Sequence, residues 1–221
     1  MAQKYFRYVP NFEYVSRTND KSISDYTNVK NLFKRVKLRE DIFQDLTYFT
    51  KYQVIGDDRP DNVAHEVYDD ANYDWLVMLS NNIVNLETEW PMSQESFEKY
   101  LLNKYGSYEN LYNIKHYETS EIVDSRKRII VPKGLIVPSD YSITYFDTGL
   151  NQYVTRSGLI EVTNYNYELN LQNEKRNIFL LKPYYISLVL DDLDRLMPYS
   201  EGSSQYVSDS LVRGENIRLY Q

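Results

Sequence analysis

The 221-residue sequence contains no cysteine, only two histidines and only seven glycines. The absence of cysteine excludes disulfide bonds, zinc–thiolate sites and cysteine nucleophiles together, and it fits a reducing compartment. Phosphate-binding and dinucleotide-binding loops need glycine-rich fingerprints, and none of those fingerprints occurs in the chain. These absences remove the commonest nucleotide-dependent and thiol-dependent enzyme classes.

Long apolar runs are missing as well. No run approaches the roughly 18 apolar residues that a membrane-spanning helix needs, and the opening MAQKYFRYVPNF has no apolar core of a cleaved secretion signal. The net charge of −7 argues against general binding to nucleic acid, because neutralising phosphates needs clustered cations. We therefore expect neither a membrane nor a nucleic acid among the partners.

Residues able to do catalysis are scarce. His65 and His116 are the only histidines, and His65 follows an apolar pair on an expected helix, where a surface position is favoured. The acidic residues Asp57, Asp58 and Asp61 lack the spacing of an EF-hand. No His-Glu-x-x-His motif or nucleophile elbow occurs. We expect no catalytic residue, no cofactor and no metal site.

Tyrosine is the abundant residue, with 23 copies. It combines a large contact area with a polar tip and few rotatable bonds, which favours it at interfaces. Half-buried strands or drift in composition would give the same abundance. A protein rich in interfaces and an ordinary tyrosine-rich fold therefore both stay open.

Residues 52–85 carry the strongest local pattern, YQVIGDDRPDNVAHEVYDDANYDWLVMLSNNIVN. The β-formers before Gly56 predict a strand over residues 50–55. Pro60 suits the first turn of a helix, and apolar residues follow it at helical spacing. The expected local order is strand, turn and helix.

A second helix is expected over residues 72–80, ending at Asn81 and Asn82, which tolerate the left-handed conformation found after helices. Trp75 belongs to the apolar face of this helix, which favours a place in the core. Stacking against a sugar is the alternative role for Trp75.

The β-α-α-β order resembles the LysM module, a small unit that binds N-acetylglucosamine polymers through its two strand–helix loops. The resemblance is carried by a Tyr-x-Val strand, a Gly-Asp turn, an apolar-Ala helix start and an Asn after the second helix. The residues concerned are Tyr52, Val54, Gly56, Asp57, Val63, Ala64 and Asn81. The two loops would be residues 56–59 and 81–85, where Arg59 suits a protein surface better than a sugar groove.

Residues 93–105, SQESFEKYLLNKY, predict a further helix that begins at a serine N-cap and is followed by a glycine. The combined string RPDNVAHEVY…WLVMLSNNIVN…WP…FEKYLLNKYG resembles the baseplate wedge protein 53 family of contractile-tailed bacteriophages, whose members contain a LysM-like domain. The segment YELNLQNEKRNIFLLKPYYI resembles the C-terminal part of that family. The resemblance is strong over residues 48–106 and moderate over residues 167–197.

The resemblance implies a structural virion protein of a phage tail baseplate, made in the host cytoplasm and present in several copies in a six-fold assembly. It implies that the protein joins neighbouring wedges through protein–protein contacts during assembly. The implied partners are the large helical core subunits of the wedge and a small sheath-initiator-like wedge protein. The alternative is a LysM-type module that binds peptidoglycan or chitin.

The expected fold class is α+β, with a LysM-like core and following helix, a short antiparallel β region, C-terminal strand-helix elements and an extended N-terminal arm. The β region rests on short runs rich in β-formers, and the C-terminal elements rest on a helical pattern, an apolar run and a second helix opened by a proline. The expected segments are an N-terminal arm and lead-in (1–47), the LysM-like domain with its capping helix (48–106), a β-rich region (107–163), a helix-strand-helix unit (164–197) and a flexible tail (198–221).

Three segments leave alternatives open. The first 25 residues are either an extended arm that lies on a partner or a strand folded back on its own domain. Residues 30–39, KNLFKRVKLR, are a cationic patch that is either a solvated face or faces an acidic partner surface. The tail could dock as a short segment. The residues expected to bind partners are Gly56, Asp57, Asp58, Arg59, Asn81, Asn82, Ile83, Tyr5, Tyr8 and Phe12.

Overall fold

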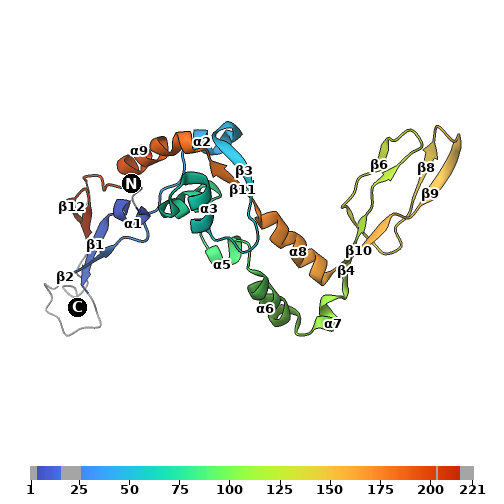
Figure 1. Ribbon diagram of the computed structural model, residues 1–221, viewed down its shortest axis with the longest axis horizontal. Coiled ribbons are helices and arrows are strands. Elements are labelled where there is room, and N and C mark those ends of the chain that lie inside the picture. The colour runs from blue at the N-terminus through green and yellow to red at the C-terminus, as the bar shows by residue number, and fades with distance from the viewer. Residues whose placement is uncertain (1–3, 16–25, 203, 215–221) are drawn as a thin grey trace. The chain divides into compact units, whose positions relative to one another are not determined.

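The computed structural model describes residues 4–15, 26–202 and 204–214, and the described chain has the expected mixed α+β composition (Figure 1). Internal contacts divide the chain into two compact units: unit 1 joins Met1–Trp90 with Asn177–Gln221, and unit 2 is Pro91–Arg176. The chain therefore leaves unit 1 at Trp90 and returns to it at Asn177. The five-segment division drawn from the sequence stays a prediction.

Unit 1 contains short helices and strands from both ends of the chain. In its first part these are α1 (Tyr5–Tyr8), β1 (Asn11–Val15), β2 (Tyr26–Lys30), α2 (Glu40–Gln44), the 3₁₀ turn η1 (Leu46–Tyr48), β3 (Phe49–Gln53), α3 (Pro60–Tyr68), the 3₁₀ turn η2 (Ala71–Tyr73), α4 (Asp74–Ser80) and α5 (Leu86–Glu89). In its second part they are β11 (Asn177–Leu181), the 3₁₀ turn η3 (Pro183–Tyr185), α9 (Ile186–Leu196), β12 (Tyr206–Ser208) and β13 (Leu211–Arg213).

The strand and two helices expected around residues 50–80 are present as β3, α3 and α4. Pro60 occupies the first turn of α3, as predicted, and Asp69 in the left-handed conformation ends that helix. The strand that pairs with β3 is β11, in an antiparallel register that runs from Phe49 opposite Leu181 to Gln53 opposite Asn177 (Figure 1). The strand partner of β3 therefore follows unit 2 in the sequence and lies outside residues 48–106, where the LysM-like domain was expected. The LysM-like core stays a prediction.

The main core lies in unit 1, where α3, α4 and α9 contribute apolar side chains together with β11. Val63, Leu76 and Leu193 are buried from these helices, and Leu181 is buried from the strand. Each such side chain contributes roughly 1.5–3 kcal/mol by leaving water. The helical spacing of apolar residues in the sequence is what brings them to one side of each helix.

Both ends of the chain contribute to a second sheet of unit 1, with strand order β12-β13-β1-β2. β1 pairs antiparallel with β2 and parallel with β13. Val9, just before β1, is buried in the core. For residues 4–15 the structure therefore has the strand folded back on its own unit, and the segment expected as a flexible tail contains two strands in a docked position.

Unit 2 contains two helices that pack on each other, a third short helix and the β region. Its elements are α6 (Gln94–Tyr105), α7 (Tyr108–Leu111), β4 (Ile114–Thr119), β5 (Ile122–Val123), β6 (Ile129–Val131), β7 (Ile136–Val137), β8 (Ile143–Asp147), β9 (Gln152–Arg156), β10 (Leu159–Thr163) and α8 (Asn164–Lys175). As predicted, the Ser93 side chain caps α6, and Gly106 follows it with a positive φ of 78°. The apolar cluster between the helices is centred on Phe97, Leu101 and Leu111.

The β region of unit 2 is antiparallel, as the sequence predicts, and its strands pair with one another. The pairs are β10 with β4, β4 with β7, β5 with β6 and β8 with β9. No helix in the described part of the chain combines the length and apolarity that crossing a membrane requires.

Trp75 tests the predicted core of unit 1 directly, because its side chain is only 6% exposed. Replacing it with alanine removes a large buried ring, so Trp75→Ala should lower the free energy of unfolding by about 3–5 kcal/mol. Chemical denaturation of the full chain, followed by circular dichroism, measures this loss. Tyr184→Ala is the matched control: that ring is 84% exposed, and its loss should change the same quantity by less than about 0.5 kcal/mol.

Candidate functional site

The first expected partner-binding loop, residues 56–59, joins β3 to α3. Gly56 has a positive φ of 55°, a conformation that glycine adopts without strain. The Asp58 amide donates to the carbonyl of Ile55 at 3.2 Å, which closes the turn. Arg59 is exposed and forms an ion pair with Asp61 at 3.2 Å. This loop therefore presents charged side chains to its surroundings from a closed turn.

The second expected loop begins at Asn81, at the end of α4. The Asn81 side-chain amide donates to the carbonyls of Val77 at 2.9 Å and Phe179 at 2.8 Å. Its side-chain oxygen accepts from the amide of Phe179 at 2.8 Å. Asn81 therefore bonds to the backbone of β11 as a neighbouring strand would, and it fastens α4 to that strand.

Asn82 and Ile83 follow in the same loop and differ from Asn81. Asn82 is exposed with a positive φ of 53°, as its predicted helix-ending role requires. Ile83 is half-buried against the core. The partner-binding role of all three residues stays a prediction, and for Asn81 the polar atoms of the side chain are already bonded inside the chain.

A short segment formed by Glu89 and Trp90 bonds to both loops. The Glu89 carboxylate accepts from the backbone amides of Val84 at 2.6 Å and Asn85 at 2.9 Å. The indole N–H of Trp90 donates to the carbonyl of Asp58 at 2.9 Å, and this ring is buried. Because Glu89 and Trp90 are adjacent in the chain, their side-chain hydrogen bonds link the loop of residues 56–59 to the loop of residues 81–85.

The aromatic residues expected on the N-terminal arm pack on unit 1. The ring of Tyr5 lies 5.7 Å from the ring of Trp75, and Tyr8 is half-buried against the core. Phe12 lies in β1, where its ring stacks on Tyr14 at 6.4 Å. Burial raises the pKa of the Tyr8 phenol, with a smaller contribution from Asp194. The binding of partners by Tyr5, Tyr8 and Phe12 stays a prediction.

Trp75 takes the core position that helical spacing favours. Its indole nitrogen is the one buried side-chain nitrogen or oxygen in the described residues that lacks a hydrogen-bond partner. His65 is exposed on α3, as expected. On the same unit, burial and a 2.7 Å hydrogen bond to Glu66 raise the pKa of Tyr52 to about 12.

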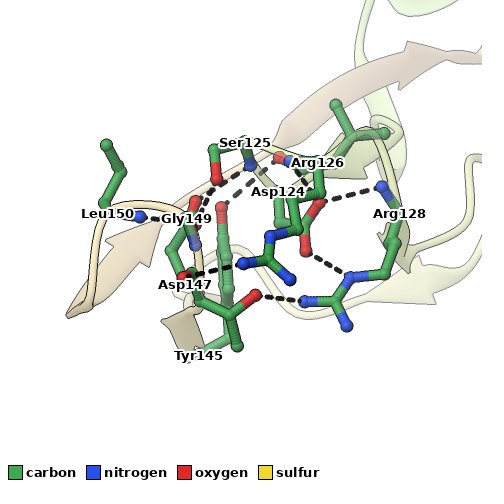
Figure 2. Close-up of polar contacts among 10 residues, drawn as sticks. Asp124, Ser125, Arg126, Arg128, Tyr145, Asp147, Gly149 and Leu150 are labelled. Atoms are coloured by element: carbon green, nitrogen blue, oxygen red, sulfur yellow. Dashed lines mark hydrogen bonds and ion pairs between the residues drawn. The ribbon is translucent and has the colours of Figure 1, made fainter.

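Unit 2 contains two buried carboxylates at one end of the β region, shown in Figure 2. The Asp147 carboxylate accepts from the Ser125 hydroxyl and from the backbone amides of Ser125 at 3.0 Å, Gly149 at 2.9 Å and Leu150 at 3.2 Å. These bonds, with the Ser125 hydroxyl contributing most, lower the pKa of Asp147 to about 2 against the opposing effect of desolvation. Asp147 thus holds the β8–β9 turn to the loop before β6.

Asp124 likewise stabilises the loop between β5 and β6. Its carboxylate accepts from the amides of Arg126 and Arg128, each at 2.9 Å, and from the Arg128 guanidinium at 2.7 Å (Figure 2). The guanidinium also donates to the Thr148 hydroxyl at 2.7 Å. Asp124 and Asp147 therefore stabilise two touching turns, and their oxygens are occupied by these bonds.

A third buried carboxylate, Glu168, lies on α8. It accepts from Lys104 and Tyr105, each at 2.8 Å, and from Tyr100 at 3.3 Å. Burial acts to raise the pKa of Glu168, but the hydrogen bonds from Lys104 and Tyr105 outweigh it and lower the pKa overall. The pKa of Lys104 is raised, chiefly by the same bond. Glu168 therefore joins α8 to α6.

None of these three carboxylates was predicted from the sequence to have a structural role. For Asp147, the turn residues Asp147-Thr148-Gly149 are the sequence signal that points to its role. The described residues contain no group of three or more histidine, aspartate or glutamate side chains placed to hold a metal ion. These three buried carboxylates accept hydrogen bonds from nearby donors, so they make the surrounding turns and helices rigid.

Loops bridged by the chain's own groups and buried carboxylates bonded to donors are features of a rigid structural subunit. The family model described as base plate wedge protein 53 matches residues 4–196, and the chain belongs to this family. It is a structural virion protein of the phage tail baseplate. No curated protein shows significant sequence similarity to the chain.

The bond between Asn81 and β11 can be tested by substitution. Asn81→Ala leaves the partly buried backbone amide and carbonyl of Phe179, at the outer edge of β11, without a hydrogen-bond partner. The free energy of unfolding should therefore fall by about 1–3 kcal/mol. Asn82→Gly is the control, because glycine keeps the left-handed backbone and the change should stay within about 0.5 kcal/mol. Chemical denaturation measures both. Equal stability of Asn81→Ala and the unaltered chain would contradict this role.

The lowered pKa of Asp147 predicts a pH dependence. Because the folded pKa is about 2, below the ordinary value of about 3.9, the charged carboxylate stabilises the turn above about pH 4, and this contribution is lost as pH falls towards about 2. Amide hydrogen exchange at Gly149 and Leu150 should therefore be faster in Asp147→Asn than in the unaltered chain at pH 5, with the difference vanishing near pH 2. A difference that is independent of pH would contradict the assignment.

Proposed function

We propose that the protein joins neighbouring baseplate wedges through protein–protein contacts while the baseplate assembles. The observation that carries the proposal is the family match, which spans residues 4–196 and therefore both units. The proposed partners are the large helical core subunits of the wedge and a small sheath-initiator-like wedge protein. The protein would be made in the host cytoplasm and present in several copies in a six-fold assembly.

The surface of each unit supports this role. Large apolar side chains stand exposed on unit 1, among them Phe33 and Leu32, and on unit 2, among them Ile136 and Tyr153. Isolated exposed apolar residues are ordinary, but neighbouring ones mark interaction sites. A subunit with such residues on two separate units has the surfaces needed to bind more than one partner.

The β-α-α-β order of β3, α3, α4 and β11 supports a LysM-like core, and with it the alternative of binding to a bacterial cell-wall glycan. Two observations favour the protein-binding role. The indole of Trp90 is bonded to one of the two loops, and Glu89 is bonded to the other. A glycan bound between the loops needs hydrogen-bonding groups there, and these backbone groups already have partners.

Co-expression with the other wedge subunits of the same phage tests the proposal. We expect a stoichiometric complex in size-exclusion chromatography, and single wedges that fail to associate into six-fold particles when this chain is left out. Negative-stain microscopy measures the particles. Six-fold particles formed without the chain would contradict wedge joining, whereas saturable binding of the isolated chain to purified cell wall would favour the glycan-binding alternative.

A further inference from the structure

A pocket of about 520 Å³ opens on unit 1, on the side formed by α1, residues 32–35 and α4. Its walls are mainly apolar, and the side chains that matter here are Phe6, Leu32, Trp75, Met78, Ile83 and Val84. The volume is within the range of pockets that hold a bound side chain or small ligand. Ile83 and Val84 belong to the second expected loop, and none of the residues 56–59 of the first loop lines the pocket.

The mouth of the pocket is apolar and open. Leu32 is 71% exposed, Val84 is 69% exposed, and Phe33, the neighbour of Leu32, is fully exposed. Phe6 is also exposed. Three exposed apolar side chains in the lining, next to a fully exposed phenylalanine, form the type of patch that marks a binding surface.

The charged side chains of the lining are mostly cationic. They are Lys4, Lys34 and Arg35, against the single acid Asp74. None of the ion pairs found in the described residues involves any of the three cations. Lys34 donates to the carbonyl of Pro198 at 2.7 Å and lies over the ring of Tyr199, 4.6 Å from its centroid. Arg35 donates to the Asn82 side chain at 3.4 Å, so neither cation has an acidic partner among these contacts.

This cationic, apolar pocket lies in a chain whose net charge is −7. A second copy of the chain is on balance repelled at long range, and an acidic segment is attracted to the local charge. The combination fits an apolar side chain presented between carboxylates.

We propose that this pocket binds a segment of a partner baseplate protein in which a large apolar side chain is flanked by aspartate or glutamate. The apolar side chain enters between α1 and α4, and the flanking carboxylates meet Lys4, Lys34 and Arg35 at the mouth. This inference rests on the proposed function, since it supplies one of the contacts through which the subunit is held in the wedge. It gives the cationic patch of residues 30–39 an acidic partner.

The first experiment locates the occupant. A photo-crosslinking amino acid replaces Val84 in the full chain, which is then assembled with the other wedge subunits of its phage and irradiated. The control position is Leu46, which is 64% exposed and does not line the pocket. We expect mass spectrometry to find, from Val84 only, a crosslink to a partner segment with acidic residues on both sides of an apolar one. Crosslinks only to this chain or to a second copy, or to a basic segment, would overturn the proposal.

The second experiment tests the charges. Arg35→Glu reverses a cation of the lining, and Lys37→Glu makes the same kind of change two residues away at an exposed position outside the lining. Arg35→Glu should weaken binding of the assembled wedge subunits by about tenfold at low salt, with a smaller loss at high salt, because surface charges are screened. Lys37→Glu should change binding less than about twofold.

The two proposals fail in different ways. If the unaltered chain forms no complex with the wedge subunits, the proposed function is wrong and this inference falls with it. If the unaltered chain and both charge variants bind equally well, the wedge-joining role stands and the pocket is not the contact. Circular dichroism of each variant checks that the fold is kept.

Discussion

The pairing of β3 with β11 is the interaction on which unit 1 depends. A sheet of two strands is only marginally stable on its own, so packing against the helices must supply the remaining stability. Asn81 bonds α4 to the outer edge of β11, and the Tyr68 hydroxyl bonds α3 to the carbonyl of Leu181 at 2.9 Å. Since β11 follows unit 2 in the chain, this core closes only after residues 91–176 have been made. The entropic cost of so long a connection grows slowly with its length.

Local signals allowed the helices to be predicted well from the sequence. Pro60 marks the start of α3, and Ser93 and Gly106 mark the two ends of α6, because each residue acts through its own backbone conformation or cap. Strand partners carry no such signal. The apolar run that forms β11 predicts a buried strand, but nothing in its sequence indicates that it pairs with β3. The parallel pairing of β1 with β13 could not be predicted from the sequence either. Those pairings are decided by burial in the folded chain.

The positions of the two candidate loops follow from the sequence, whereas the contacts between them do not. The loops around Asp58 and Asn81 could be placed from helix-end chemistry, but the Glu89–Trp90 bridge between them depends on a fold-level contact. Glu168 shows a second limit: an acidic residue on a helix is normally solvated, and here Lys104 and two tyrosines from α6 make its burial tolerable. Asp147 follows the same rule at a turn. Partners distant in sequence decide whether such a charge is buried.

The hydrogen bonds already made at the two loops favour a protein over a glycan as the bound partner. A glycan is held largely by directional hydrogen bonds, and the backbone groups of Asp58, Val84 and Asn85 that face the Glu89–Trp90 segment are already bonded. The described surface also leaves large apolar side chains uncovered, with Phe33 as the clearest case. Covering apolar area gains free energy without directional bonds, and another protein can supply such area in a shape that fits. At the two loops the polar groups therefore stabilise the chain's own turns, and exposed apolar groups such as Phe33 are available for the proposed association.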